Sequence, residues 1–98
     1  MGVTQEVANF VARTRYRDIP KDIVNLARGF ILDGTGVALA GSTDECSRIV
    51  QHHVRQAGGR PESSILGTAI ATPASKAALA NGVAAHAMDY DDTQLSTS

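Results

Sequence analysis

The chain has 98 residues, enough for one small domain. A hydrophobic share of 43% and a charged share of 19% are typical of a folded globular protein and exclude a disordered chain. The formal net charge of −1 provides no field to attract phosphates, so we expect no nucleic-acid binding. Cys46 is the only cysteine, which excludes an intrachain disulfide and a cysteine-based zinc site, and we expect a cytoplasmic protein.

The sequence also predicts no membrane segment. Residues 1–6 lack the basic and apolar regions of a signal peptide. The most apolar stretch, residues 30–40, is interrupted by Asp33 and is shorter than the roughly 20 residues that a bilayer span requires. We therefore expect this stretch to belong to a core helix.

A first amphipathic helix is expected from a cap at Thr4 to about Thr14, because Val7, Phe10 and Val11 recur at helical spacing. After a connector at residues 16–19, Pro20 suits the first turn of a second helix. The apolar positions of that second helix are Ile23, Leu26, Ala27, Phe30, Ile31, Gly34, Val37, Ala38 and Gly41. Its small residues, Gly34 and Gly36 among them, predict close packing against another helix, since each glycine otherwise costs about 1 kcal/mol of helix propensity.

A third helix is predicted from a cap at Ser42 or Thr43 to the stop at residues 58–59. Its expected buried face is Cys46, Ile49, Val50, His53, Val54 and Ala57. Residues 63–66 form a short extended segment, which we expect to pair with residues 69–71.

Thr72 followed by Pro73 predicts the cap and first turn of a fourth helix over residues 74–88. Small residues lie on nearly every side of it, so we expect other helices around it and the chain to be part of a larger protein. The sequence thus predicts an all-α fold with about four helices, one short extended segment, and a single domain over residues 1–98.

The end of this fourth helix carries the polar residues best placed for chemistry. On a helical wheel His86, Asp89 and Thr93 fall on one side and could line one pocket. An imidazole, a carboxylate and a hydroxyl can perform general acid and base catalysis, and the negative helix end favours a protonated His86.

Other interpretations of the same run stay open. Asp91 and Asp92 can be a solvated helix end, with Tyr90 a packing residue and Thr93 a loop residue. Clustered carboxylates also suit Mg²⁺ or Ca²⁺, although the glycine and glutamate of a calcium loop are missing. An Asp-x-Asp-x-Thr phosphatase nucleophile would follow a buried strand, and here an alanine-rich helix precedes it.

The remaining candidate residues are assigned structural roles. We expect Cys46 to be a buried structural cysteine. His52 and His53 are adjacent and project to different sides of a helix, so they cannot chelate one metal together. We expect His53 at the edge of the core and His52 exposed.

Two long runs together resemble the MmgE/PrpD family. Residues 77–93 read AALANGVAAHAMDYDDT and are similar to the family signature. Residues 31–41, ILDGTGVALAG, are similar to a second family block at a suitable distance, and Ile19-Pro20 and Ser64-Ile65-Leu66-Gly67 match the family layout. The resemblance covers the chain from Ala8 onward.

The resemblance implies an N-terminal part of the family's large helical domain, in a homodimer without an organic cofactor. Members such as 2-methylcitrate dehydratases, cis-aconitate decarboxylases and iminodisuccinate epimerases move a proton next to a carboxylate of a small polyacid. It implies that Asp89 and Thr93 lie in the substrate pocket, and we add His86 from its position. The family's pocket histidines and lysine lie beyond Ser98, so this chain alone is expected to be an incomplete catalyst, with neither cofactor nor metal bound. The alternative is a non-catalytic helical packing or dimerisation module.

Overall fold

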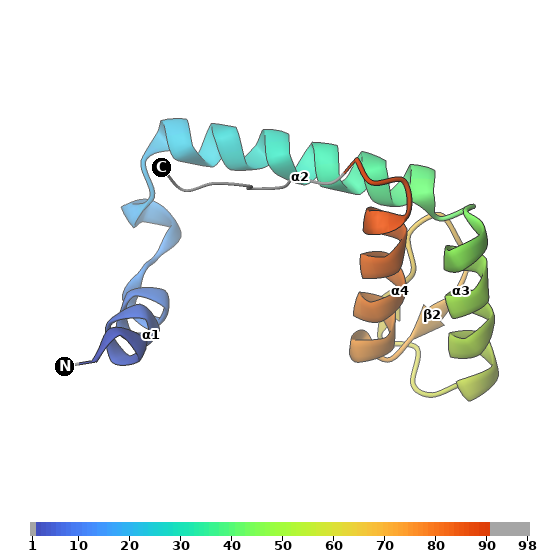
Figure 1. Cartoon of the computed structure of the whole chain (residues 1–98). Coiled ribbons are helices and arrows are strands. Elements are labelled where there is room, and N and C mark those ends of the chain that lie inside the picture. Colours follow the sequence, from blue (N-terminus) through green and yellow to red (C-terminus); the bar gives the residue numbers. More distant parts are fainter. Residues whose placement is uncertain (1, 91–98) are drawn as a thin grey trace. The chain divides into compact units, whose positions relative to one another are not determined.

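The computed structural model describes residues 2–90, which form four α-helices, one 3₁₀-helix and a two-stranded antiparallel sheet (Figure 1). In chain order the elements are α1 (Val3–Arg13), η1 (Tyr16–Asp18), α2 (Lys21–Gly41), α3 (Glu45–Ala57), β1 (Ser63–Ser64), β2 (Ala71–Thr72) and α4 (Ala74–Ala87). The chain divides into two compact units, Met1–Phe30 and Ile31–Ser98. The predicted mainly helical fold is confirmed.

In the first unit, α1 begins before the residue predicted to cap it. Its N-cap is Gly2 in extended conformation, and no side chain caps the helix. The carbonyl of Gly2 accepts the first helical hydrogen bond, from the Glu6 amide at 3.1 Å, so Thr4 already lies inside the first turn. The expected connector after α1 forms η1, where the Asp18 carboxylate accepts from the Arg15 amide at 2.8 Å.

Helix α2 follows the predicted pattern but buries little of it. Its first turn is closed by the Val24 amide donating to the Pro20 carbonyl at 3.0 Å, which confirms the helix start. Only Ala38 and Gly41 are buried, so the expected core helix is not covered within the described part of the chain. An added Cβ at Gly34 or Gly36 would meet nothing within 4 Å, and the close packing predicted at these two glycines is absent there.

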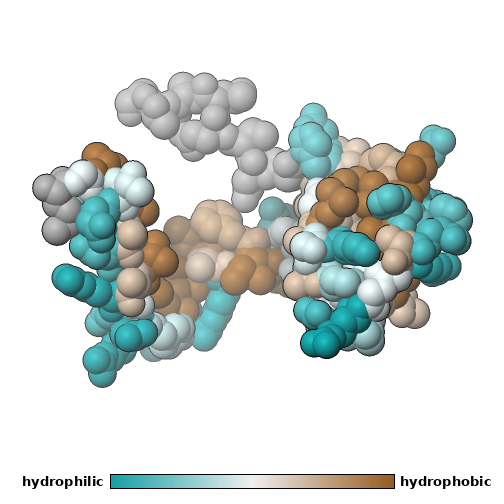
Figure 2. Space-filling view, turned by 90° about the horizontal axis from the view of Figure 1, so that it is seen from below, coloured by the Kyte–Doolittle hydropathy of each residue, from teal (hydrophilic) through white to brown (hydrophobic). Residues whose placement is uncertain are grey.

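By length and composition α2 could also cross a membrane. Very little of its most apolar part is buried within the described residues. The apolar stretch of residues 30–40 continues toward the N-terminus of α2 with Ile23, Val24 and Leu26, although charged and polar residues interrupt it there. Hydrophobic residues accordingly reach the surface in several places (Figure 2).

The turn between α2 and α3 satisfies the last carbonyls of α2 with side chains. The donors are Ser42 Oγ to the Leu39 carbonyl (2.7 Å), Thr43 Oγ1 to Ala40 (3.4 Å), Ser47 Oγ to Gly41 (2.6 Å) and Gln51 Nε2 to Ser42 (2.8 Å). Because the hydroxyls of Ser42 and Thr43 turn back to α2, the predicted caps are wrong. Asp44 caps α3 instead, accepting from the Cys46 amide at 3.3 Å.

Helix α3 buries only part of its predicted face within the described residues. Val54 is buried and Val50 packs against the core, as predicted. Cys46, Ile49, His53 and Ala57 are exposed, contrary to prediction, and Ser47, one helical step of about 100° from Cys46, is buried instead. His52 is exposed, as expected.

A small core lies between α3, α4 and the two strands. It contains Val54, Ile65, Ala77 and Ala80, with Val50 and Ile70 packed against it. The predicted extended segment pairs antiparallel as expected, but the paired strands are shorter and shifted, with Ser63 opposite Thr72 and Ser64 opposite Ala71, so that only Ala71 of the expected partner 69–71 takes part. Thr72 therefore belongs to a strand and does not cap α4, whose N-cap is Pro73.

Candidate functional site

Helix α4 carries the candidate site at its C-terminal end, and its small residues let neighbouring backbones approach. Ala77, Ala80 and Ala84 recur at helical spacing and are buried. The helix packs along α3 and against both strands. At Gly41 the last residue of α2 also approaches it, so closely that an added Cβ would lie 1.9 Å from the Ala84 carbonyl oxygen. The tight contact of α2 with another helix thus occurs at Gly41 and not at Gly34 or Gly36, where it was predicted.

The side chain of Asn81 ties α4 to the chain around β1. Its Oδ1 accepts from the Leu66 amide at 2.9 Å, and its Nδ2 donates to the Ser64 carbonyl at 3.1 Å. One amide group therefore satisfies a donor and an acceptor of a loop that precedes it by more than a dozen residues. Sequence analysis assigned Asn81 no role, although a lone amide in an alanine-rich helix was a usable signal.

The helix ends just before the candidate aspartate. Helix α4 stops at Ala87, Met88 is its C-cap, and Asp89 adopts the left-handed conformation at φ 57°. The Asp89 amide donates to the His86 carbonyl at 3.0 Å. The helical wheel that grouped His86 with Asp89 and Thr93 assumed a helix that continues, whereas α4 ends before Asp89 and the backbone leaves the helical conformation there.

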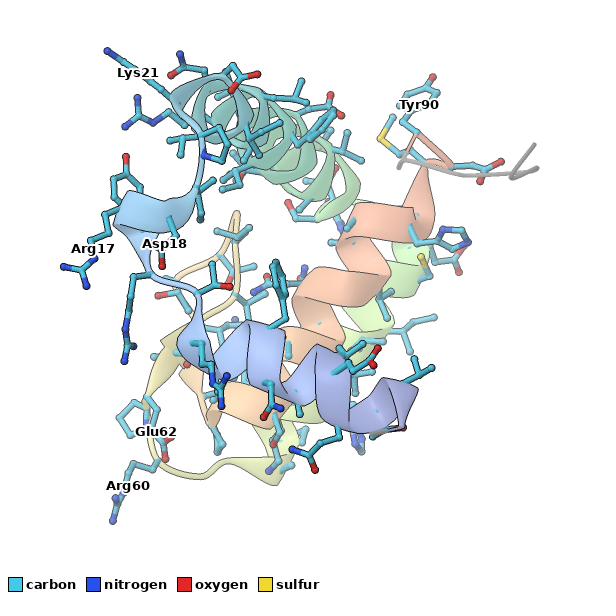
Figure 3. All side chains as sticks on the ribbon, turned by 90° about the vertical axis from the view of Figure 1, so that its left-hand side faces the viewer. Arg17, Asp18, Lys21, Arg60, Glu62 and Tyr90 are labelled. Carbon is cyan, nitrogen blue, oxygen red and sulfur yellow. The ribbon has the colours of Figure 1, made fainter. Side chains whose placement is uncertain are left out.

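The structure brings the first two site residues to one helix end. His86 lies in the last turn of α4, Asp89 directly follows the helix, and both are exposed. Tyr90, expected as a packing residue in the solvated-end interpretation, is 69% exposed and lies beyond the end of α4 (Figure 3). Thr93, Asp91 and Asp92 lie outside the described residues.

Within residues 2–90 no group of three or more His, Cys, Asp or Glu is placed to hold a metal ion. The arrangement that remains is a carboxylate and an imidazole at the negative end of a helix. Such groups can accept, donate or steer a proton. They offer no fixed positive charge for an anionic substrate.

Comparison with known proteins decides the family. Residues 5–98 match the model of the MmgE/PrpD N-terminal domain. The chain belongs to the MmgE/PrpD family. The resemblance of the two sequence runs to this family is thereby confirmed.

Two curated relatives are cis-aconitate decarboxylases. This MmgE/PrpD chain is 29% identical over 92 residues to the mouse (Mus musculus) protein and 28% identical over 92 residues to the human (Homo sapiens) protein. In both cases the match covers 93% of this chain and 19% of the relative. The chain therefore spans about a fifth of the length of these relatives. No solved structure matches it.

Proposed function

We propose that this chain is the N-terminal part of a lyase acting on small di- or tricarboxylic acids, with Asp89 in the substrate site. Membership of the MmgE/PrpD family and similarity to two cis-aconitate decarboxylases support the proposal. Among the possible reactions, decarboxylation of cis-aconitate is the first to test, and dehydration of 2-methylcitrate is the second. The proposal includes a homodimer, as the family resemblance implies, and a cytoplasmic location, as the single cysteine suggests.

The observation that carries the proposal is the conformation of Asp89. A non-glycine residue in the left-handed region costs about 1–2 kcal/mol, and glycine or asparagine is preferred directly after a helix. The Asp89 carboxylate also lies at the negative end of α4, and the repulsion between the two lowers the stability of the fold by roughly a further 0.3–1 kcal/mol. A residue that lowers stability twice over at one position is a candidate for function.

In the proposed site the three side chains have separate roles. The Asp89 carboxylate accepts or steers the proton on the carbon next to a substrate carboxylate. The Thr93 hydroxyl donates a hydrogen bond to a substrate carboxylate, and His86 is a second proton carrier. A polyanionic substrate beside Asp89 also needs cationic partners, which the proposal assigns to the part of the subunit outside the matched segment.

A chimeric enzyme tests this function. The chain replaces the matched 92-residue segment of mouse cis-aconitate decarboxylase, and CO₂ release from cis-aconitate is measured. We expect the chimera to be active and Asp89→Asn to lower kcat about 10²-fold or more, since a positioned acid or base contributes on the order of 10²–10⁴-fold. Circular dichroism checks that both proteins fold.

The matched control is Asp18→Asn, which removes the same charge from a carboxylate that only closes η1. It should leave the rate of the chimera unchanged. Equal rates for Asp89→Asn and the parent chimera would refute the assignment of Asp89. A folded chimera inactive on cis-aconitate, 2-methylcitrate and iminodisuccinate would refute the lyase proposal.

A second candidate function is a helical packing module without catalysis. The exposed large hydrophobic residues favour it, among them Val7, Phe10 and Ile31. Analytical ultracentrifugation of the 98-residue chain separates the two functions only in part, because a lyase fragment also carries such surface. The chimeric enzyme distinguishes the two functions. A packing module would let the chimera fold, but its turnover would not depend on Asp89.

A further inference from the structure

Helix α2 has an apolar face of which only one end is covered. Ile31, Gly34, Ala38 and Gly41, here called the α2 stripe, follow each other at three- and four-residue spacing and so share one side of the helix. Gly41 meets Ala84 of α4, and Ala38, one turn earlier, is also buried. Further along the same side, Ile31 is 68% exposed and Gly34 faces open space within the described residues. An existing interface therefore continues onto uncovered surface.

The chemistry of α2 favours a protein over a lipid bilayer as the cover. Arg28 and Asp33 lie near the middle of the apolar helix. A charged residue at the centre of a membrane helix raises the free energy of membrane insertion by about 2.5–3.5 kcal/mol, whereas a leucine lowers it by only about 0.3–0.6 kcal/mol. A protein surface can leave both charges at its rim and still bury the α2 stripe.

We propose that the Ile31 end of the α2 stripe is an interface for the remaining part of an MmgE/PrpD subunit, whether that part is in the same or a separate chain. The cis-aconitate decarboxylases match this chain along only 19% of their length, so most of a family subunit is available to cover the stripe. The interface continues the contact of Gly41 with α4. The proposed interface depends on membership of the MmgE/PrpD family and not on which reaction the protein catalyses.

Co-purification tests the interface. The tagged 98-residue chain is co-expressed with the part of mouse cis-aconitate decarboxylase outside the matched 92 residues, and the eluate is analysed by light scattering. We expect a one-to-one complex whose yield falls at least tenfold with Ile31→Lys. The matched control is Asn25→Lys, which adds the same charge on the opposite side of α2 from the stripe.

Every outcome bears on the proposal. An absent complex, or equal yields with Ile31→Lys and Asn25→Lys, overturns it. A dimer of the chain that Ile31→Lys dissociates overturns it in favour of a second copy, and flotation with phosphatidylcholine and phosphatidylglycerol vesicles overturns it in favour of a membrane. A complex that forms while the chimera lacks turnover supports the interface and refutes only the proposed function.

Discussion

Replacing Gly41 by alanine tests the close contact between the end of α2 and Ala84 of α4, the helix that carries the candidate site. The added methyl group would lie 1.9 Å from the carbonyl oxygen of Ala84 and 2.9 Å from its carbonyl carbon, where an ordinary contact begins at 3.4 Å. Both neighbours are backbone atoms and cannot rotate away. The ends of α2 and α4 must therefore separate by about 1.5 Å. Because this region is closely packed, such a separation lowers the stability of the fold.

The expected change in the free energy of unfolding follows from two opposing terms. Overpacking costs typically about 1–3 kcal/mol, and alanine returns roughly 0.5–1 kcal/mol of helix propensity, less at the last residue of a helix. We expect Gly41→Ala to be destabilised by about 1–2 kcal/mol. In a domain of this size that is roughly a 4–16 °C lower Tm, because about 1 kcal/mol shifts Tm by 4–8 °C.

Urea unfolding followed by circular dichroism measures this difference, and Gly36→Ala is the control. An added Cβ at Gly36 meets nothing within 4 Å, so the same substitution in the same helix should stabilise the chain by roughly 0.5–1 kcal/mol. The two glycine variants should thus move in opposite directions. Equal stabilities would show that α2 and α4 do not meet at Gly41.

Three further substitutions separate structural from functional residues. Asp89→Gly should stabilise the chain by about 1 kcal/mol in urea unfolding, because glycine adopts the left-handed conformation freely; a loss of stability would contradict the strain at this position. Asn81→Ala should destabilise it by about 1–3 kcal/mol, since the Leu66 amide and the Ser64 carbonyl both lose their partner, and an unchanged midpoint would show that water replaces the amide. Thr72→Val should leave the Tm unchanged or raise it, because the Thr72 hydroxyl is buried without a partner; a clear decrease would reveal a hydrogen bond.

The sequence predicted those parts of the fold that depend on local signals. Helical periodicity located α2 within a residue or two, and Pro20 and the pair Gly58-Gly59 marked a helix start and a helix end. The short hairpin of β1 and β2 was also predicted. These features follow from backbone preferences that each residue carries with it.

Helix caps and buried faces were predicted less well. Several adjacent residues can cap the same helix, and the side of a helix that is buried depends on the elements packed against it. Ser42, Thr43 and Asp44 could all cap α3, and only the geometry of the α2 end assigns the two hydroxyls elsewhere. The buried face of α3 was predicted only in part: Val50 and Val54 pack in the core as expected, whereas Cys46 and His53 are exposed, since a helix with several apolar positions is oriented by the elements it packs against. The periodicity of α3 by itself does not contain that information.

For the candidate site, the sequence found the residue types but not their geometry. His86 and Asp89 were placed on a continuing helix, whereas the chain turns at Met88 and gives Asp89 a positive φ. No glycine or asparagine signalled this turn. Asn81 was missed because its two bonds join segments that only the fold brings together.

The left-handed Asp89 also has an evolutionary consequence. Glycine and asparagine suit this backbone position better, so either replacement should stabilise the folded chain. If Asp89 acts in the proposed reaction, related genes that have lost that reaction should drift to Gly or Asn here, whereas genes under selection for turnover should keep the less stable residue. One codon would then distinguish the two groups of genes.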